Sequence, residues 1–247
     1  MSSRDSDQGA SYRPDATLRY ADHDDAVIDV HLPAEETDRL LVFLHGGFWK
    51  AKYDRRHTRP LARALAEEGW TVATPEYRRV GTGGGWPTTA NDVRTAMQTL
   101  PNLLADIGKP ATRTVVSGHS AGGHLALWLA SEEFAIDRVV ALAPVADLRE
   151  AARLGLGGSA TQAFMGGRPD EVDYRPADPI ARLARRPSAE IVVLHGTADD
   201  TVPVSISRGL RDAHPWVDVR ELDGVGHDEF LEPGSAAWLP LLGALAR

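Results

Sequence analysis

The spacing of apolar and polar residues along the chain predicts an alternation of strands and helices. Short β-branched or apolar runs bounded by glycine and polar residues are typical of buried strands, and they occupy residues 40–44, 70–74, 114–116, 139–143, 191–194 and about 217–222. Segments with helical apolar spacing lie between these runs, at residues 55–68, 88–104, 123–130 and 205–213 and from Ser235 onward. This alternation predicts a mostly parallel sheet with helices on both faces.

Two segments depart from the alternation. Residues 17–20 and 26–31 are separated by a short polar stretch, which is typical of an antiparallel hairpin at the edge of a sheet. With this hairpin, roughly eight strands are expected. Residues 144–187 contain no strand pattern but several glycines and prolines, and long insertions of this kind are usually lids or binding loops.

The residues Gly118-His119-Ser120-Ala121-Gly122 stand between an expected strand and an expected helix. A serine on such a tight strand-to-helix turn has strained backbone angles, so the residues two before and two after it must lack a Cβ atom. Its hydroxyl is then exposed at the top of the sheet, beside the next amide and the helix N-terminus. The pattern predicts that Ser120 is a nucleophile.

A second glycine-containing turn, His45-Gly46-Gly47-Phe48-Trp49, follows the strand at 40–44. Glycines after a buried strand let backbone N–H groups turn inward, which is how a loop supplies donors for a developing oxyanion. We therefore expect the amides of Gly47, Phe48 and Ala121 to form an oxyanion hole. An ordinary strand-to-helix turn is the alternative.

The strand at 191–194 ends in a polar loop that contains Asp199 and Asp200, and His227 follows later. Serine is a poor nucleophile at its free pKa, so it needs a base, and the base needs an acceptor that fixes its tautomer. The chain order serine, acid, histidine is the order found in α/β-hydrolases. We interpret Asp228, which is next to the histidine, as a surface charge.

With these residues the chain resembles the α/β-hydrolase superfamily from about Thr17 to the C-terminus. Members tend to read Gly-x-x-Asp-x-x-Val-Pro, and the match at residues 196–203 implies that Asp199 is the catalytic acid, with Asp200 as the alternative. The resemblance implies an α/β-hydrolase fold with a small cap after the sixth strand. We expect a single domain at 16–247, with a helical cap insertion at about 145–187 lying over Ser120.

Composition narrows the classes of function. The 247 residues carry a formal net charge of −8, which argues against nucleic acid or an anionic membrane as the main partner. The absence of cysteine excludes disulfides, thiol catalysis and thiolate metal sites. With no apparent signal peptide or membrane span, these features favour a cytoplasmic enzyme. Residues 1–15 are polar and are expected to form a flexible tail.

The expected chemistry requires no metal and no organic cofactor. The histidines do not form a metal-binding pair on a helix, and no Walker-type loop is present. The expected partner is a small-molecule acyl substrate, and a homodimer is compatible with the sequence.

Three segments of the chain also resemble the kynurenine formamidases (arylformamidases), which hydrolyse N-formylkynurenine to kynurenine and formate. They are residues 45–49, residues 118–126 and Tyr77-Arg78. Such an enzyme needs an aromatic wall for the aryl amine and a cation for the substrate carboxylate. The candidates are Phe48, Trp49, Trp86 and Arg78, although an aromatic residue after a strand is as often part of the core. A broad carboxylesterase for short-chain esters is the alternative. A non-catalytic ligand-binding protein is a more remote one, because no member of the triad is missing.

Overall fold

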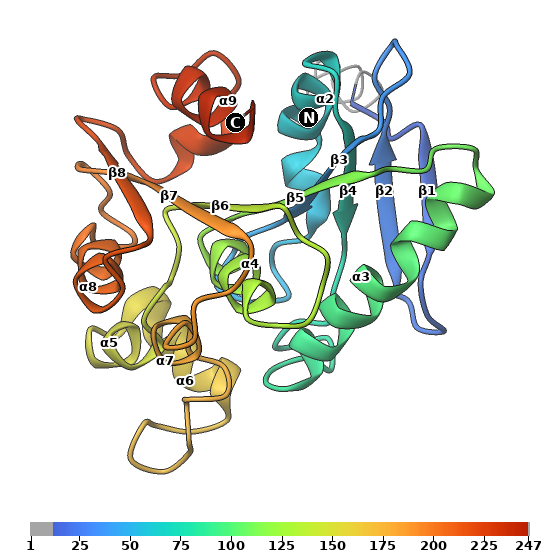
Figure 1. Cartoon of the computed structure of the whole chain (residues 1–247). Helices are drawn as coiled ribbons and strands as arrows, with labels where there is room; N and C mark the ends of the chain where they lie inside the picture. The colour runs from blue at the N-terminus through green and yellow to red at the C-terminus, as the bar shows by residue number, and fades with distance from the viewer. Residues whose placement is uncertain (1–11, 247) are drawn as a thin grey trace, which may run out of the picture.

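Eight strands form one sheet at the centre of the structure (Figure 1). The computed structural model describes residues 12–246, so residues 1–11 of the predicted tail lie outside the described residues. The spatial order of the strands is β1-β2-β4-β3-β5-β6-β7-β8. Their bounds are β1 Ala16–Arg19, β2 Val27–His31, β3 Arg39–Leu44, β4 Thr71–Pro75, β5 Arg113–His119, β6 Arg138–Leu142, β7 Glu190–Gly196 and β8 Asp218–Leu222.

The pairing of the strands confirms the predicted sheet. β1 pairs antiparallel with β2, as expected for the hairpin, and β2 pairs antiparallel with β4. From β4 through β8 all neighbouring strands are parallel. The carboxyl ends of β3, β5 and β7 therefore lie at one edge of the sheet, which is where ligands bind in open α/β sheets.

Helices cover both faces of the sheet (Figure 1). Along β3, Leu40 and Val42 belong to a buried cluster with residues of α3 and α4, whereas Leu41 and Phe43 belong to a cluster with residues of α2 and α9. This alternation is the period of two that a strand buried on both faces requires. The helix bounds are α2 Arg59–Glu67, α3 Thr88–Asp106, α4 Ala121–Ala130, α5 Leu148–Arg153, α6 Leu156–Met165, α7 Pro179–Arg182, α8 Ser205–Ala213 and α9 Trp238–Ala246, with 3₁₀ turns η1 Arg55–Thr58 and η2 Asp228–Leu231.

None of the helices within residues 12–246 combines the length and the apolar character that a membrane crossing requires.

The segment after β6 contains α5, α6 and α7 and no strand, as the sequence predicts. It packs beside α4: His124 Nε2 bonds the carbonyl of Ala177 at 2.9 Å, and Trp128 Nε1 donates to the carbonyl of Pro176 at 3.2 Å. None of its residues lines the cavity at Ser120. Gly157 of α6 nevertheless lies against the ring of Phe48, which lines that cavity. A cap over Ser120 therefore stays a prediction.

The strand β8 forms one edge of the sheet and carries charged side chains. Arg220 pairs with Asp218 of the same strand at 2.6 Å, and Glu221 pairs with Arg208 of α8 at 2.6 Å. Within the described residues β8 pairs only with β7.

Candidate active site

Ser120 occupies a strained turn between β5 and α4. Its backbone angles are φ 56° and ψ −116°, in a region that residues with a side chain rarely adopt. A Cβ atom on Gly118 would lie 2.3 Å from the carbonyl oxygen of Gly122, and one on Gly122 would lie 2.0 Å from that of Leu44. The two glycines are thus required by close backbone contacts. The Ser120 side chain does not cap α4, so its hydroxyl remains available to the cavity beside it.

Asp199 and His227 come together at the same edge of the sheet. Nδ1 of His227 bonds Oδ2 of Asp199 at 2.6 Å, and the amides of Thr201 and Val202 donate to Oδ1 of Asp199 at 2.9 and 2.8 Å. Although burial by itself raises the pKa of Asp199, the hydrogen bonds from His195 and His227 lower it well below its usual range. Asp199 is therefore a carboxylate at neutral pH, and it holds the proton of His227 on Nδ1.

The alternative acid, Asp200, points elsewhere and bonds the hydroxyl of Thr201 at 3.1 Å. Ser120 and His227 line one cavity. Within the described residues His227 is bonded to Asp199 and not to Ser120. Such catalytic hydrogen bonds often tighten only in the substrate complex.

The loop after β3 has a run of three residues with positive φ beside Ser120. The φ angles are 101° at Gly47, 51° at Phe48 and 54° at Trp49. Within residues 12–246 the amides of Gly47 and Phe48 donate to no protein acceptor, and both residues line the cavity together with Ser120. Free amides in this position can donate to an oxyanion, as can the amide of Ala121 at the start of α4.

A buried group of charged and polar residues around Glu76 contacts the start of this loop. His45 Nε2 bonds Oε1 of Glu76 at 2.9 Å, and the hydroxyl of Tyr77 donates to the carbonyl of His45 at 2.6 Å. Glu76 also accepts from the amide of Arg55 at 2.9 Å and lies 3.4 Å from the guanidinium of Arg79. Burial alone would raise the pKa of Glu76, but the bond from His45 and the nearby cations lower it to about 2.

His119, the residue before the nucleophile, supports the loop that carries His227. Its Nε2 bonds the carbonyl of His227 at 3.0 Å, and the two rings lie 4.5 Å apart. Burial lowers the pKa of His119 to about 3, so the ring is neutral. His195 bonds Ser207 and the carbonyl of Val202 at 2.7 and 2.8 Å. Both histidines thus bond loops beside the ends of their strands.

The cavity at Ser120 has a volume of about 380 Å³. Its walls combine apolar rings and side chains with a few polar groups, and its lining consists of Gly47, Phe48, Tyr53, His57, His119, Ser120, Thr201, His227, Asp228 and Leu231. Sequence reasoning did not single out Tyr53, His57 or Leu231 as lining residues. They come from irregular segments that follow the predicted motifs, and no pattern in the sequence marks them.

Of the residues predicted to contact substrate, Phe48 lines this cavity and the other three do not. Trp49 is fully buried and stacks on Phe164 with ring centroids 4.4 Å apart. Trp86 packs against Phe164 and Trp128. The guanidinium of Arg78 forms two hydrogen bonds with Asp92, at 2.9 and 2.6 Å. Each of the three has a partner in the protein, and its contact with substrate stays a prediction.

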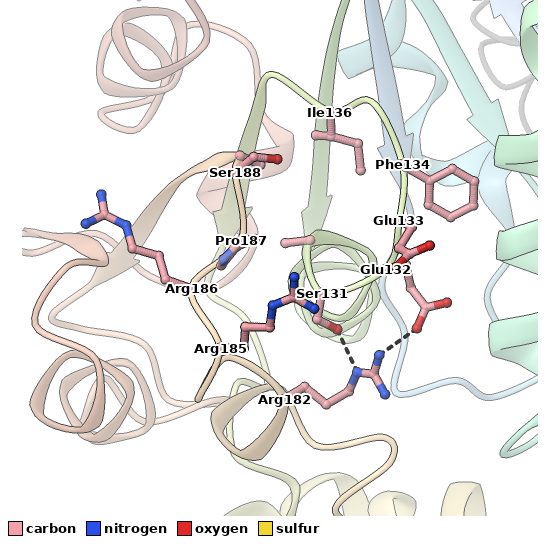
Figure 2. A pocket seen from close by; sticks show the side chains of 12 residues that line it. Ser131, Glu132, Glu133, Phe134, Ile136, Arg182, Arg185, Arg186, Pro187 and Ser188 are labelled. Atoms are coloured by element: carbon pink, nitrogen blue, oxygen red, sulfur yellow. Dashed lines mark hydrogen bonds and ion pairs between the residues drawn. The ribbon is translucent and has the colours of Figure 1, made fainter.

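A second cavity, of about 470 Å³, lies at the amino ends of the strands, where β6 and β7 begin. Figure 2 shows the side chains that line it. It is lined by residues that follow α4 and residues that precede β7. Arg182 crosses it, donating to Ser131 and pairing with Glu132, both at 2.6 Å. Its lining contains no histidine, whereas the cavity at Ser120 brings a serine and a histidine together. The cavity at Ser120 is therefore the candidate active site.

Solved structures with this arrangement of sheet and helices include several esterases. A thermophilic esterase from Thermogutta terrifontis, solved with propionate, superposes with a TM-score of 0.71 at 23% identity and covers 93% of this chain and 90% of its own. A bifunctional GH43-CE protein from Bacteroides eggerthii has a TM-score of 0.76 at 22% identity, covering 93% of this chain and 37% of its own. These likenesses show the α/β-hydrolase fold.

Sequence comparison finds similar proteins in Mycobacterium tuberculosis. The probable carboxylic ester hydrolase LipM is 27% identical over 194 residues, which are 71% of this chain and 44% of LipM. The esterase LipC is 26% identical over 214 residues, which are 76% of this chain and 52% of LipC. The chain thus spans about half the length of these relatives. The family model BD-FAE matches residues 28–213, and the chain therefore belongs to the BD-FAE family.

Proposed function

We propose that the protein is a serine carboxylesterase that hydrolyses esters with small acyl groups. The observation that carries this proposal is the 2.6 Å bond between Asp199 and His227, because it leaves Nε2 of His227 free in the cavity that Ser120 also lines. A base oriented in this way can activate a serine hydroxyl. The esterase names of the similar proteins LipM and LipC support the same chemistry.

The mechanism follows from the residues in the cavity. Nε2 of His227 takes the hydroxyl proton of Ser120 as Oγ attacks the carbonyl carbon of the ester. The negative charge that forms on the carbonyl oxygen is stabilised by the amides of Gly47, Phe48 and Ala121; loss of one such donor typically costs about 3 kcal/mol of barrier. His227 then protonates the departing alcohol, and a water molecule hydrolyses the acyl-enzyme by the reverse sequence.

The size and lining of the cavity support a small acyl group. A volume of about 380 Å³ lies near the lower end of the range for ligand sites. Phe48, Tyr53 and Leu231 offer apolar walls. Hydrolysis of an aryl formamide has weaker support, since Trp49, Arg78 and Trp86 have partners outside the cavity.

The test compares substrates on the purified chain. Hydrolysis of p-nitrophenyl acetate, butyrate and dodecanoate is measured beside that of N-formylkynurenine, with Ser120→Ala as the inactive variant and Ser188→Ala, an exposed serine, as its control. We expect the two short esters to be hydrolysed fastest and only Ser120→Ala to abolish turnover. Faster turnover of the formamide would reject the carboxylesterase assignment, and full activity of Ser120→Ala would reject the nucleophile.

A further inference from the structure

The cavity at Ser120 contains a group of side chains that the hydrolytic mechanism does not fully use. One ligand atom each of His119, His227 and Asp228 lies within 4.8 Å of the other two. All three residues line the cavity, and Asp228 is exposed while both histidines are buried. We propose that these residues form an inhibitory site for a divalent transition-metal ion of the zinc type.

The hydrogen bonds of the two histidines leave one ring nitrogen of each without a protein partner among the described residues. In His227, Nδ1 is bonded to Asp199, so Nε2 is the nitrogen that can bind a metal. A histidine ligand almost always donates its second N–H to a carboxylate or a carbonyl, which fixes its tautomer and raises its basicity. Asp199 provides that carboxylate at 2.6 Å.

His119 is oriented in an equivalent way. Its Nε2 bonds the carbonyl of His227 at 3.0 Å, which leaves the lone pair on Nδ1. Each histidine thus has one nitrogen held by the protein and one that can bind a metal.

The type of ligand selects the class of metal. Two imidazoles and one carboxylate are a donor set that suits Zn²⁺, whereas Mg²⁺ and Ca²⁺ prefer oxygen ligands alone. Three protein ligands leave a fourth position for water, and the cavity has room for it. The lining contains no lysine or arginine to repel a cation.

Binding at this site would stop the proposed reaction. A metal on Nε2 of His227 occupies the lone pair that must accept the proton of Ser120. Inhibition therefore rests on the proposed function, but binding of the metal does not. Removal of the ion by a chelator should restore the rate, because no covalent bond is broken.

Isothermal titration calorimetry of the full chain with ZnCl₂ tests the site itself. We expect one Zn²⁺ per chain and no binding of Mg²⁺. Asp228→Asn and His119→Gln should each weaken the affinity about 10-fold or more, since changes even to residues behind the ligands cost 10- to 100-fold. The matched controls are Asp200→Asn, which removes the same charge from a neighbouring loop, and His57→Gln, which changes another histidine of the cavity lining. Both controls should bind Zn²⁺ like the wild type.

The second measurement is the hydrolysis of p-nitrophenyl acetate with Zn²⁺ and then with EDTA, each variant being compared with its own zinc-free rate. We expect inhibition that EDTA reverses and that requires about 10-fold more Zn²⁺ in Asp228→Asn. Absence of one-to-one binding, or equal losses of affinity in Asp228→Asn and Asp200→Asn, would overturn the site. Binding without inhibition would overturn its inhibitory role. If the chain hydrolyses no ester at all, the proposed function fails, and calorimetry still decides the metal site.

Discussion

Removal of the buried charge of Glu76 tests whether the group below the oxyanion loop stabilises the fold. The substitution Glu76→Gln keeps the shape of the side chain but leaves the guanidinium groups of Arg55 and Arg79, 3.7 and 3.4 Å away, with one carboxylate fewer. The pKa of Glu76 is lowered from 4.5 to about 2, which corresponds to about 3 kcal/mol in favour of the charged form. Breaking one side of a buried ion pair costs about 3–5 kcal/mol. We expect Glu76→Gln to lower the free energy of unfolding at pH 7 by about 3 kcal/mol.

The same reasoning fixes the dependence on pH. Because the pKa of Glu76 is lower in the folded chain, its stabilising effect is complete above the unfolded pKa of 4.5 and is lost as the pH falls toward about 2. The wild-type chain loses this contribution in acid, whereas Glu76→Gln has none to lose. The difference in the free energy of unfolding between the two proteins should therefore narrow by about 1 kcal/mol between pH 7 and pH 4.

Urea denaturation followed by tryptophan fluorescence measures both effects. The control is Glu36→Gln, which removes the same charge from an exposed position and should change the free energy of unfolding by less than about 0.5 kcal/mol. A loss below about 1 kcal/mol in Glu76→Gln at pH 7 would refute the reasoning. So would a difference between wild type and variant that stays constant from pH 7 to pH 4.

Three further outcomes follow from the site and its surroundings. Asp199→Asn should lower kcat for a short-chain ester about 10⁴-fold, because the tautomer of His227 is no longer fixed. Asp200→Asn should keep most of the activity. Equal losses of kcat in the two variants would contradict the assignment of Asp199 as the catalytic acid. Gly122→Ala should lower the melting temperature sharply or prevent folding, since the new Cβ would lie 2.0 Å from the carbonyl oxygen of Leu44. Gly209→Ala, which has open space inside α8, should instead stabilise the chain by about 0.5–1 kcal/mol. If thermal denaturation shows that Gly122→Ala is tolerated, the turn at Ser120 can relax. Burial raises the pKa of Asp178 to about 7, so its contribution to the free energy of unfolding should fall as the pH rises from about 4 to 7. In urea denaturation the wild type should therefore lose stability relative to Asp178→Asn over this range, and parallel curves for the two proteins would argue against the raised pKa.

The order of the strands and helices could be predicted because the sheet is buried on both faces. Strands buried on both faces are short continuous apolar runs, and the run at 139–143, bounded by polar or helical segments, has this pattern. The turn at Ser120 was predictable for a different reason, since its backbone requires glycine at Gly118 and Gly122. The predicted helix at 55–68 instead begins with the turn η1, and Pro60, which has no N–H to donate, lies in the first turn of α2.

The rest of the cavity lining could not be predicted, because it depends on partners that are distant in the sequence. Trp49 follows a strand and could equally have faced substrate, but Phe164 of α6 covers it. Arg78 has a charge that suits a carboxylate ligand, but Asp92 of α3 neutralises it. Neither partner leaves a signal in the sequence near Trp49 or Arg78. The local pattern therefore does not show that these side chains already have partners within the protein.

The charged edge of the sheet at β8 bears on how copies of the chain behave in concentrated solution. An edge strand offers unpaired N–H and C=O groups to which the strand of another molecule could add. A strand approaching β8 would have to displace water from Asp218, Arg220 and Glu221, whose ion pairs lie along that edge. Charges at such a position are a common means of preventing edge-to-edge aggregation. We therefore expect the charged residues of β8 to disfavour the addition of a strand from another copy of the chain.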